Sequence, residues 1–196
     1  MRHTMQELVP ADEYLIHQTP ETFATVSQAD YSWTEKVWFS LFNKDGSVQI
    51  DFGIGKYINR NVIDAFAGVS RGVEQITVRA STELDNDLER MGVGPIDYEI
   101  IEPMGKLRCI LRENDIQPIS FDVVVTPIMR PFLERKDAQR GVDGLRVASD
   151  LRRFHQACTV SGWLTIDGET LEITDDTWFG YRDRSWGVRM DVGEPA

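Results

Sequence analysis

The feature that most constrains the fold of this chain is an alternation of apolar and polar side chains along most of its length. Residues 47–54 read Ser-Val-Gln-Ile-Asp-Phe-Gly-Ile. Successive side chains of an extended strand point to opposite faces, so this run predicts a strand with one buried face and one wet face. Similar runs predict further strands at residues 37–41, 76–80, 107–111, 119–125, 158–160, 164–166 and 171–173.

Tight turns are predicted between several of these runs. Asp-Gly pairs at residues 45–46 and 167–168 each stand between apolar runs, where glycine supplies the positive φ that a hairpin needs. Adjacent strands without intervening helical periodicity favour antiparallel sheets, arranged as a sandwich or a barrel. We therefore expect an all-β fold with at most one or two short helices. One helix is expected at residues 132–140, after Pro131 and before the glycine-rich residues 141–144.

Composition narrows the range of partners and compartments. The chain has 196 residues, a length that fits one domain. Its formal net charge of −11 repels nucleic-acid phosphates and anionic lipid headgroups, so neither is expected as a partner. No secretory signal and no apolar run of the roughly 20 residues that span a bilayer is present, so we expect a cytoplasmic protein without membrane insertion. Cys109 and Cys158 lie in strand-like runs, which predicts buried, reduced thiols rather than a disulfide or a metal pair.

Several well-known site motifs are incomplete in this sequence. Residues 53–61 contain a Gly-Lys pair but lack the other elements of a phosphate-binding loop, so a bend or bulge at the end of a strand is the better interpretation. His3, His17 and His155 have no second imidazole or thiolate at ligand spacing, so no metal site is expected. The nucleophile-elbow motif of serine hydrolases is absent. We expect no cofactor.

The stretch best suited to chemistry is residues 177–189, Thr-Trp-Phe-Gly-Tyr-Arg-Asp-Arg-Ser-Trp-Gly-Val-Arg. As a strand it places Tyr181 and Asp183 on one face and Arg182 and Arg184 on the other. An inward Asp183 would lie beside the Tyr181 hydroxyl among aromatic side chains, where desolvation raises the pKa of a carboxyl group. Such an acid can protonate an alkene, and aromatic rings stabilise the resulting carbocation.

A structural interpretation of the same stretch stays open beside this one. An Arg-Asp-Arg run often forms an ion-pair cluster, in which a neighbouring guanidinium lowers the pKa of Asp183 and makes it an anchor of the fold. His155 has the opposite alternation from Cys158 and Val160, which places it outward or in a concave groove. The aromatic residues that could line a lipophilic pocket, and that would equally suit a core, are Trp33, Trp38, Phe66, Trp163 and Trp178.

The C-terminal region also resembles a known family. Residues 180–187, Gly-Tyr-Arg-Asp-Arg-Ser-Trp-Gly, and the run 154–169 before them are similar to the signature region of the carotenoid 1,2-hydratase (hydroxyneurosporene synthase) family, part of the AttH-like, lipocalin-like superfamily. Residues 30–39 and 68–72 resemble a poorly characterised bacterial branch of it. The resemblance implies lipocalin-like β domains around an apolar cavity. It also implies cofactor-free, acid-catalysed chemistry on an isoprenoid or polyene.

The resemblance implies roles for individual residues. The Tyr-x-Asp element of the family maps onto Tyr181 and Asp183, with Asp183 as the proton donor and Tyr181 orienting it. Trp186 would stabilise the cation, and His155 would position water. Arg184 stands where the family commonly has histidine. A carbocation can lead to hydration, dehydration, isomerisation or cyclisation. We therefore expect a hydro-lyase, an isomerase or a cyclase if the chain is an enzyme.

The domain organisation leaves alternatives to catalysis open. We expect residues 1–196 to form a single lipocalin-like β domain, with 1–30 as a partly irregular extension. Residues 175–196 are interpreted as the possible start of a second domain, which members of the resembled family have. The chain could instead be a non-catalytic binding module for a hydrophobic ligand. It could also be a half-protein that associates with a partner β domain or with a second copy of itself.

Overall fold

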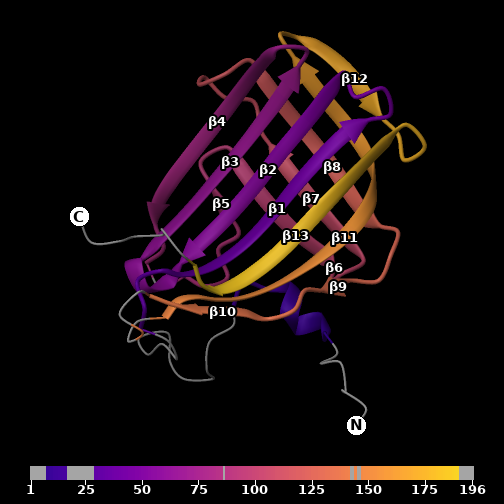
Figure 1. The fold of residues 1–196 in the computed structure, drawn as a ribbon. Coiled ribbons are helices and arrows are strands. Elements are labelled where there is room, and N and C mark those ends of the chain that lie inside the picture. The colour runs from indigo at the N-terminus through magenta and orange to yellow at the C-terminus, as the bar shows by residue number, and fades with distance from the viewer. Residues whose placement is uncertain (1–7, 17–28, 86, 142–143, 145–146, 190–196) are drawn as a thin grey trace.

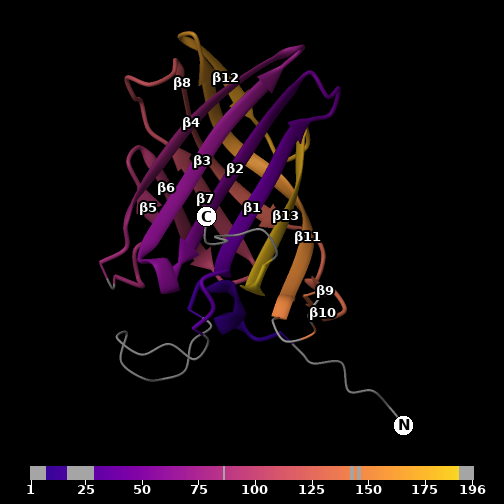
Figure 2. The same ribbon diagram turned by 60° about the vertical axis from the view of Figure 1, so that its left-hand side comes forward.

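The alternating runs form one antiparallel sheet that wraps into a nearly closed barrel (Figures 1 and 2). The computed structural model describes residues 8–16, 29–85, 87–141, 144 and 147–189. Its strands are β1 (Trp33–Asn43), β2 (Val48–Tyr57), β3 (Val62–Arg71), β4 (Glu74–Glu83), β5 (Gly92–Val93), β6 (Ile96–Glu102), β7 (Lys106–Leu111), β8 (Ile119–Pro127), β9 (Phe132–Leu133), β10 (Asp137–Arg140), β11 (Val147–Ile166), β12 (Glu169–Ile173) and β13 (Trp178–Val188). The helices of this described part are two short 3₁₀ turns, η1 (Pro10–Glu13) and η2 (Ile58–Arg60). The predicted all-β class is confirmed.

The order of strands around the barrel is β4-β3-β2-β1-β13-β11-β8-β7-β6-β5. The two end strands, β4 and β5, approach each other and nearly close the sheet. β13 lies between β1 and β11 and pairs with both of them. The described part of residues 175–196 therefore contributes a central strand to this barrel. Across the described segments, no helix is long and apolar enough to cross a membrane.

Both hairpins predicted from Asp-Gly pairs are confirmed. β1 and β2 are joined by a turn in which Gly46 has φ +71° and donates its N–H to the Asn43 carbonyl at 3.0 Å. β11 and β12 are joined through Asp167 and Gly168, with φ +50° and +83°. Successive left-handed residues match the twist of the paired strands, and glycine adopts this conformation without steric cost.

The prediction of a short helix at residues 132–140 is wrong. Phe132 pairs with His155, and Asp137 pairs with Leu151, so this segment forms β9 and β10 along β11. β11 is 20 residues long and continues beyond its pairing with β8. Its exposed backbone donors and acceptors can pair with an extended segment, whereas a short helix makes few hydrogen bonds of its own.

Side chains on the inner face of the sheet fill the centre of the barrel. The rings of Phe39, Phe52, Tyr98 and Phe121 pack there with centroid separations of 5.8–6.5 Å. Cys109 and Cys158 are buried and unbridged, as predicted. Burial raises the pKa of Cys158 to about 12, so that thiol is protonated at neutral pH.

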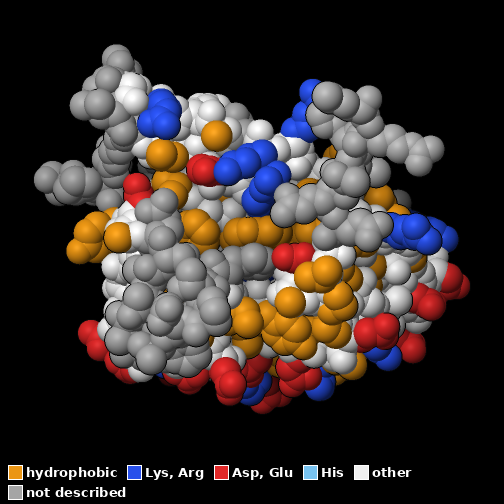
Figure 3. Space-filling view, turned by 90° about the horizontal axis from the view of Figure 1, so that it is seen from below, with side chains coloured by type: hydrophobic (Ala, Val, Ile, Leu, Met, Phe, Trp, Pro, Cys, Tyr) orange, Lys and Arg blue, Asp and Glu red, His pale blue; other side chains and the backbone are white. Residues whose placement is uncertain are grey.

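One end of the barrel, the lower end in Figure 1, is covered by η1. Leu15 follows η1 and is buried in the core, and Glu13 is buried among polar side chains. In a view from this end, apolar side chains gather in the middle of the surface and acidic side chains at its lower border (Figure 3). The N-terminal segment thus contributes both an apolar and a charged group to the interior.

A candidate acid-base site on the outer face of the barrel

The two faces of β13 carry different chemistry, as its alternation predicts. Arg182 and Arg184 are fully buried on the inner face. Tyr181 and Asp183 lie on the outer face, where Tyr181 is 38% exposed and Asp183 lines a surface pocket. The expectation of an inward Asp183 is therefore wrong, because the arginines occupy the inward positions.

Each inward arginine is paired with a buried carboxylate. Arg182 donates to both carboxylate oxygens of Glu13, at 2.5 and 2.7 Å, and to the Gln156 side-chain oxygen at 3.0 Å. Arg184 donates to the Glu35 carboxylate at 2.5 Å. Buried charges are tolerated when they are paired and hydrogen-bonded. Both arginines of the Arg-Asp-Arg run thus form ion pairs, as the structural interpretation predicts. Their partners are Glu13 of η1 and Glu35 of β1, however, and not Asp183.

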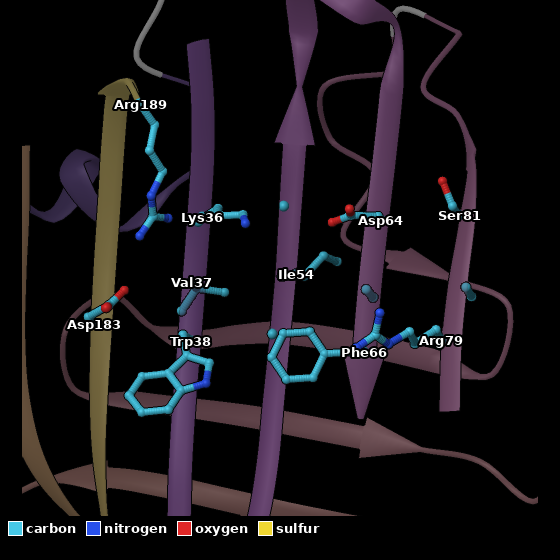
Figure 4. Close-up of a pocket in the computed structure, with 14 residues that line it drawn as sticks. Lys36, Val37, Trp38, Ile54, Asp64, Phe66, Arg79, Ser81, Asp183 and Arg189 are labelled. Carbon is cyan, nitrogen blue, oxygen red and sulfur yellow. The ribbon is translucent and has the colours of Figure 1, made fainter. Parts of the chain in front are cut away.

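A pocket of about 570 Å³ lies on the outer face of strands β13, β1, β2, β3 and β4 (Figure 4). We call it the outer groove, and its long and charged side chains are Lys36, Trp38, Asp64, Phe66, Arg79, Asp183 and Arg189. Trp38 is the register partner of Asp183 on one side and of Gly53 on the other, and Gly53 is the partner of Phe66. The candidate acid and two of the candidate aromatic residues therefore meet in one groove.

Glycine residues of β2 form part of the floor of the outer groove. A Cβ on Gly53 would collide with the Phe66 ring, which lies over that position. A Cβ on Gly55 would come within 3.1 Å of both Asp64 and Lys36. The absence of side chains at these two positions lets side chains of β1 and β3 lie across β2.

Asp183 is the carboxyl group nearest to Trp38 in register, and its side chain is 18% exposed. Burial raises the pKa of Asp183, and this effect outweighs the nearby charges of Arg153, His155 and Arg189, which lower it. The Arg153 Nε atom lies 3.9 Å from an Asp183 oxygen, which is a loose ion pair. A carboxyl group with a raised pKa keeps its proton to higher pH than an exposed aspartate, as an acid catalyst requires.

A hydrogen-bonded chain of three side chains lies beside the outer groove. The Tyr181 hydroxyl is hydrogen-bonded to Nδ1 of His155, and Nε2 of His155 to the Glu134 carboxylate. The Tyr181 and His155 rings stack at 5.1 Å, and Tyr181 meets Trp38 edge-on at 6.3 Å. Because Glu134 engages one ring nitrogen of His155, the other nitrogen is held toward Tyr181, and a proton can pass between hydroxyl and imidazole.

The remaining aromatic candidates lie away from the outer groove. The Arg184 guanidinium lies over the Trp186 ring at 5.2 Å, so this tryptophan packs with the inward arginine. Trp178 is buried in the core, and Trp163 of β11 is 39% exposed outside the groove. Trp33 begins β1, and its buried Nε1 has no hydrogen-bond partner among the described residues.

Sequence reasoning missed the charged side chains of this region, which are Lys36, Asp64, Arg79, Glu134 and Arg189. Lys36 stands two positions before Trp38, so alternation along the strand could have placed both side chains on the same face. The positions of Asp64 and Arg79 in the groove follow only from the register of β2, β3 and β4, which the sequence does not give. Glu134 lay in the segment expected to be helical. Within the described residues, no three or more His, Cys, Asp or Glu side chains are grouped so that they could hold a metal ion.

Comparison with known proteins identifies the family and supports the fold. The chain belongs to a family of unknown function (DUF8625), whose model matches residues 8–196. A search of curated proteins finds no match. Among solved structures, kievitone hydratase from Nectria haematococca is similar with a TM-score of 0.54 and 16% identity, over 78% of this chain and 47% of that one. The structure of CghA with Sch210972 is similar with a TM-score of 0.43 and 12% identity, over 91% of this chain and 55% of that one. The chain thus spans about half the length of these two proteins.

Proposed function

We propose that this member of a family of unknown function is a cofactor-free acid catalyst that acts on a lipophilic, unsaturated small molecule of isoprenoid or polyene type. The reaction takes place in the outer groove and is a hydration, an isomerisation or a cyclisation. The observation that carries the proposal is the position of Asp183. Burial raises the pKa of this carboxyl, and it lines a pocket of about 570 Å³ together with Trp38 and Phe66.

The proposal also draws on two likenesses. The barrel resembles that of kievitone hydratase, a protein named for the addition of water. Residues 180–187 resemble the signature region of the carotenoid 1,2-hydratase family, in which the matching aspartate is the proposed proton donor. Both likenesses favour protonation of a carbon–carbon double bond as the first step.

In the proposed reaction the O–H bond of Asp183 breaks while a C–H bond forms at one alkene carbon. The cation remains on the other carbon, next to Trp38, whose ring can stabilise it. Trp38 takes the role that the resemblance assigned to Trp186. In a hydration, water adds to the cation and its proton returns to Asp183, either directly or through Tyr181 and His155. In an isomerisation, a carbon next to the cation loses a proton to Asp183, and the electrons of that C–H bond form the new double bond.

A non-catalytic, lipocalin-like binding module is the second candidate function. The charges of Arg153 and Arg189 favour it, because they stabilise the ionised form of Asp183. In this case the groove would hold a hydrophobic ligand unchanged, or complete a site together with a partner β domain or a second copy of the chain.

Isotope incorporation separates the two candidates. The full chain is incubated in D2O with geranylgeraniol or geranylgeranoic acid as acyclic isoprenoid probes, and the products are examined by mass spectrometry. Hydration adds one D2O, and isomerisation exchanges one hydrogen for deuterium. We expect Asp183→Asn to lower incorporation at least about 100-fold, the usual contribution of a general acid.

The matched control for this test is Asp51→Asn. Asp51 also lies on the outer face, and burial also raises its pKa, but it does not line the outer groove. This variant should keep full incorporation, and both variants should keep the circular dichroism of the parent. Undiminished incorporation by Asp183→Asn would refute the proposed acid. Probe binding by the parent without incorporation would establish the binding module instead.

A further inference from the structure

The charge of the outer groove is opposite to that of the whole chain. Three cationic side chains, Lys36, Arg79 and Arg189, line it together with two carboxylates, Asp64 and Asp183. With both carboxylates ionised the groove has a surplus of one positive charge, although the chain as a whole carries −11, and protonation of Asp183, the proposed acid, makes the surplus two. A local surplus of this kind attracts an anion to the groove.

The three cationic groups of the groove lack close carboxylate partners. Among the residues that the structure describes, no carboxylate oxygen lies within 4 Å of the charged groups of Lys36, Arg79 or Arg189, whereas Arg153 beside the groove meets two carboxylates at 3.9 and 4.0 Å. The Lys36 ammonium instead lies 5.5 Å from the centroid of the Tyr57 ring. Burial lowers the pKa of Lys36, so its charged form is destabilised there. An anionic ligand would offset this cost.

We infer that the outer groove binds a ligand with a single carboxylate on an unsaturated hydrocarbon chain. Arg189 and Lys36 hold the carboxylate, and Trp38 and Phe66 contact the hydrocarbon. This inference rests on the proposed function, because it concerns the same groove. It specifies the substrate class as an unsaturated carboxylic acid. A guanidinium beside an ammonium supplies the charge-assisted hydrogen bonds that a carboxylate accepts.

The arrangement of the side chains gives the ligand a direction. Arg189 follows β13 and Lys36 lies on β1, next to β13, and both reach into the groove (Figure 4). Trp38 lies two residues farther along β1, about 7 Å from Lys36. A carboxylate held between Lys36 and Arg189 therefore leaves the hydrocarbon chain to pass over Trp38, beside Asp183, toward Phe66.

The charge balance favours a carboxylate over a phosphate monoester. One negative charge never exceeds the surplus of the groove, whereas a phosphate monoester, which carries about 1.5 to 2 negative charges at neutral pH, exceeds it whenever Asp183 is ionised. The extra charge would lie near Asp64 and Asp183, which repel it.

Fluorescence binding of cis-parinaric acid tests this inference. This fatty acid carries a conjugated polyene, and its emission on excitation of tryptophan reports that it is bound to the protein. Its methyl ester has the same chain without the charge. We expect the acid to bind at least roughly tenfold more tightly than the ester, as charged hydrogen bonds provide. Lys36→Met and Arg189→Met should each weaken binding of the acid roughly tenfold and leave binding of the ester unchanged.

The control for the loss of charge is Lys44→Met. Lys44 lies in the β1–β2 hairpin outside the groove, with its ammonium 5.5 Å from the Phe179 ring centroid, as Lys36 lies by Tyr57. This variant should bind the acid as the parent does. Equal affinity for acid and ester, or equal effects of Lys36→Met and Lys44→Met, would overturn the inference. Stronger competition by dodecyl phosphate than by dodecanoate would overturn the choice of a carboxylate.

The failure of this inference can be told apart from failure of the proposed function. Asp183→Asn should bind parinaric acid at least as tightly as the parent, because it removes no cation and can only remove a repelling charge, while it loses deuterium incorporation from D2O into the isoprenoid probes. If the acid needs Lys36 and Arg189 but incorporation does not need Asp183, the carboxylate site stands and the acid catalysis fails. If incorporation needs Asp183 but the ester binds as well as the acid, the catalysis stands and the carboxylate site fails.

Discussion

Replacement of Glu13 by alanine should lower the free energy of unfolding by about 3–5 kcal/mol, because it leaves the Arg182 charge buried and unpaired. Both side chains are 0% exposed. The Glu13 carboxylate accepts two hydrogen bonds from the guanidinium, one from the Tyr98 hydroxyl at 3.2 Å and one from the Met104 N–H at 2.8 Å. The substitution removes all four acceptor contacts at once.

The remaining contacts of Arg182 set the size of this loss. Its Nε still donates to Gln156 at 3.0 Å, and its guanidinium still lies over the Phe154 ring at 5.0 Å. These contacts stabilise part of the charge, which keeps the loss inside the range of about 3–5 kcal/mol measured when one partner of a buried pair is removed. In a domain of this size, each kcal/mol shifts Tm by about 2–4 °C, so Tm should fall by roughly 6–20 °C.

Urea denaturation followed by tryptophan fluorescence measures this loss. The control is Glu169→Gln, which breaks the Arg71–Glu169 pair at 3.8 Å, whose side chains are 58% and 75% exposed. Exposed pairs contribute about 1 kcal/mol or less, so this variant should unfold close to the parent. A Glu13→Ala protein no less stable than Glu169→Gln would refute the argument that a buried ion pair anchors the N-terminal segment in the barrel.

Two other predictions concern β2. Burial lowers the pKa of Lys56 to about 8 from 10.5, so the unfolded chain holds this proton between those pH values while the folded chain releases it. The stability of the parent should therefore rise by about 1–3 kcal/mol from pH 8 to pH 10.5 relative to Lys56→Met, in urea denaturation across that range. Gly53→Ala displaces the Phe66 ring from the floor of the outer groove, so it should weaken parinaric acid binding severalfold in the fluorescence assay.

Structural features that depend on residues adjacent in the sequence could be predicted. The alternation in residues 47–54 and the turn at Asp167 and Gly168 each depend on a few adjacent positions, and the structure confirms them. The outward placement of His155 also follows from alternation. The exception is the segment at residues 132–140, where a local helix signal was overridden by pairing with β11.

The face of β13 that points inward could not be predicted from its own residues. A desolvated arginine is unfavourable unless a carboxylate meets it, and the partner of Arg182 is Glu13, 169 positions away. Nothing in residues 177–189 shows that such a partner exists. On these residues alone, the face with the aromatic rings and the carboxyl group is the better candidate for the interior, which is why the expected position of Asp183 is wrong.

The inner ion pairs and the outer groove are linked through the register of β13. Side chains alternate along a strand, so a slip by one residue would exchange the two faces. It would bring Asp183 into the barrel, where Glu13 and Glu35 would repel it, and would move the two arginines outward. The pairs formed by Arg182 and Arg184 thus hold the register that places Asp183 opposite Trp38. Among the described residues the ion-pair partner of Asp183 is Arg153, which lies beside the groove at 3.9 Å, so the position of the acid is set mainly from inside the barrel.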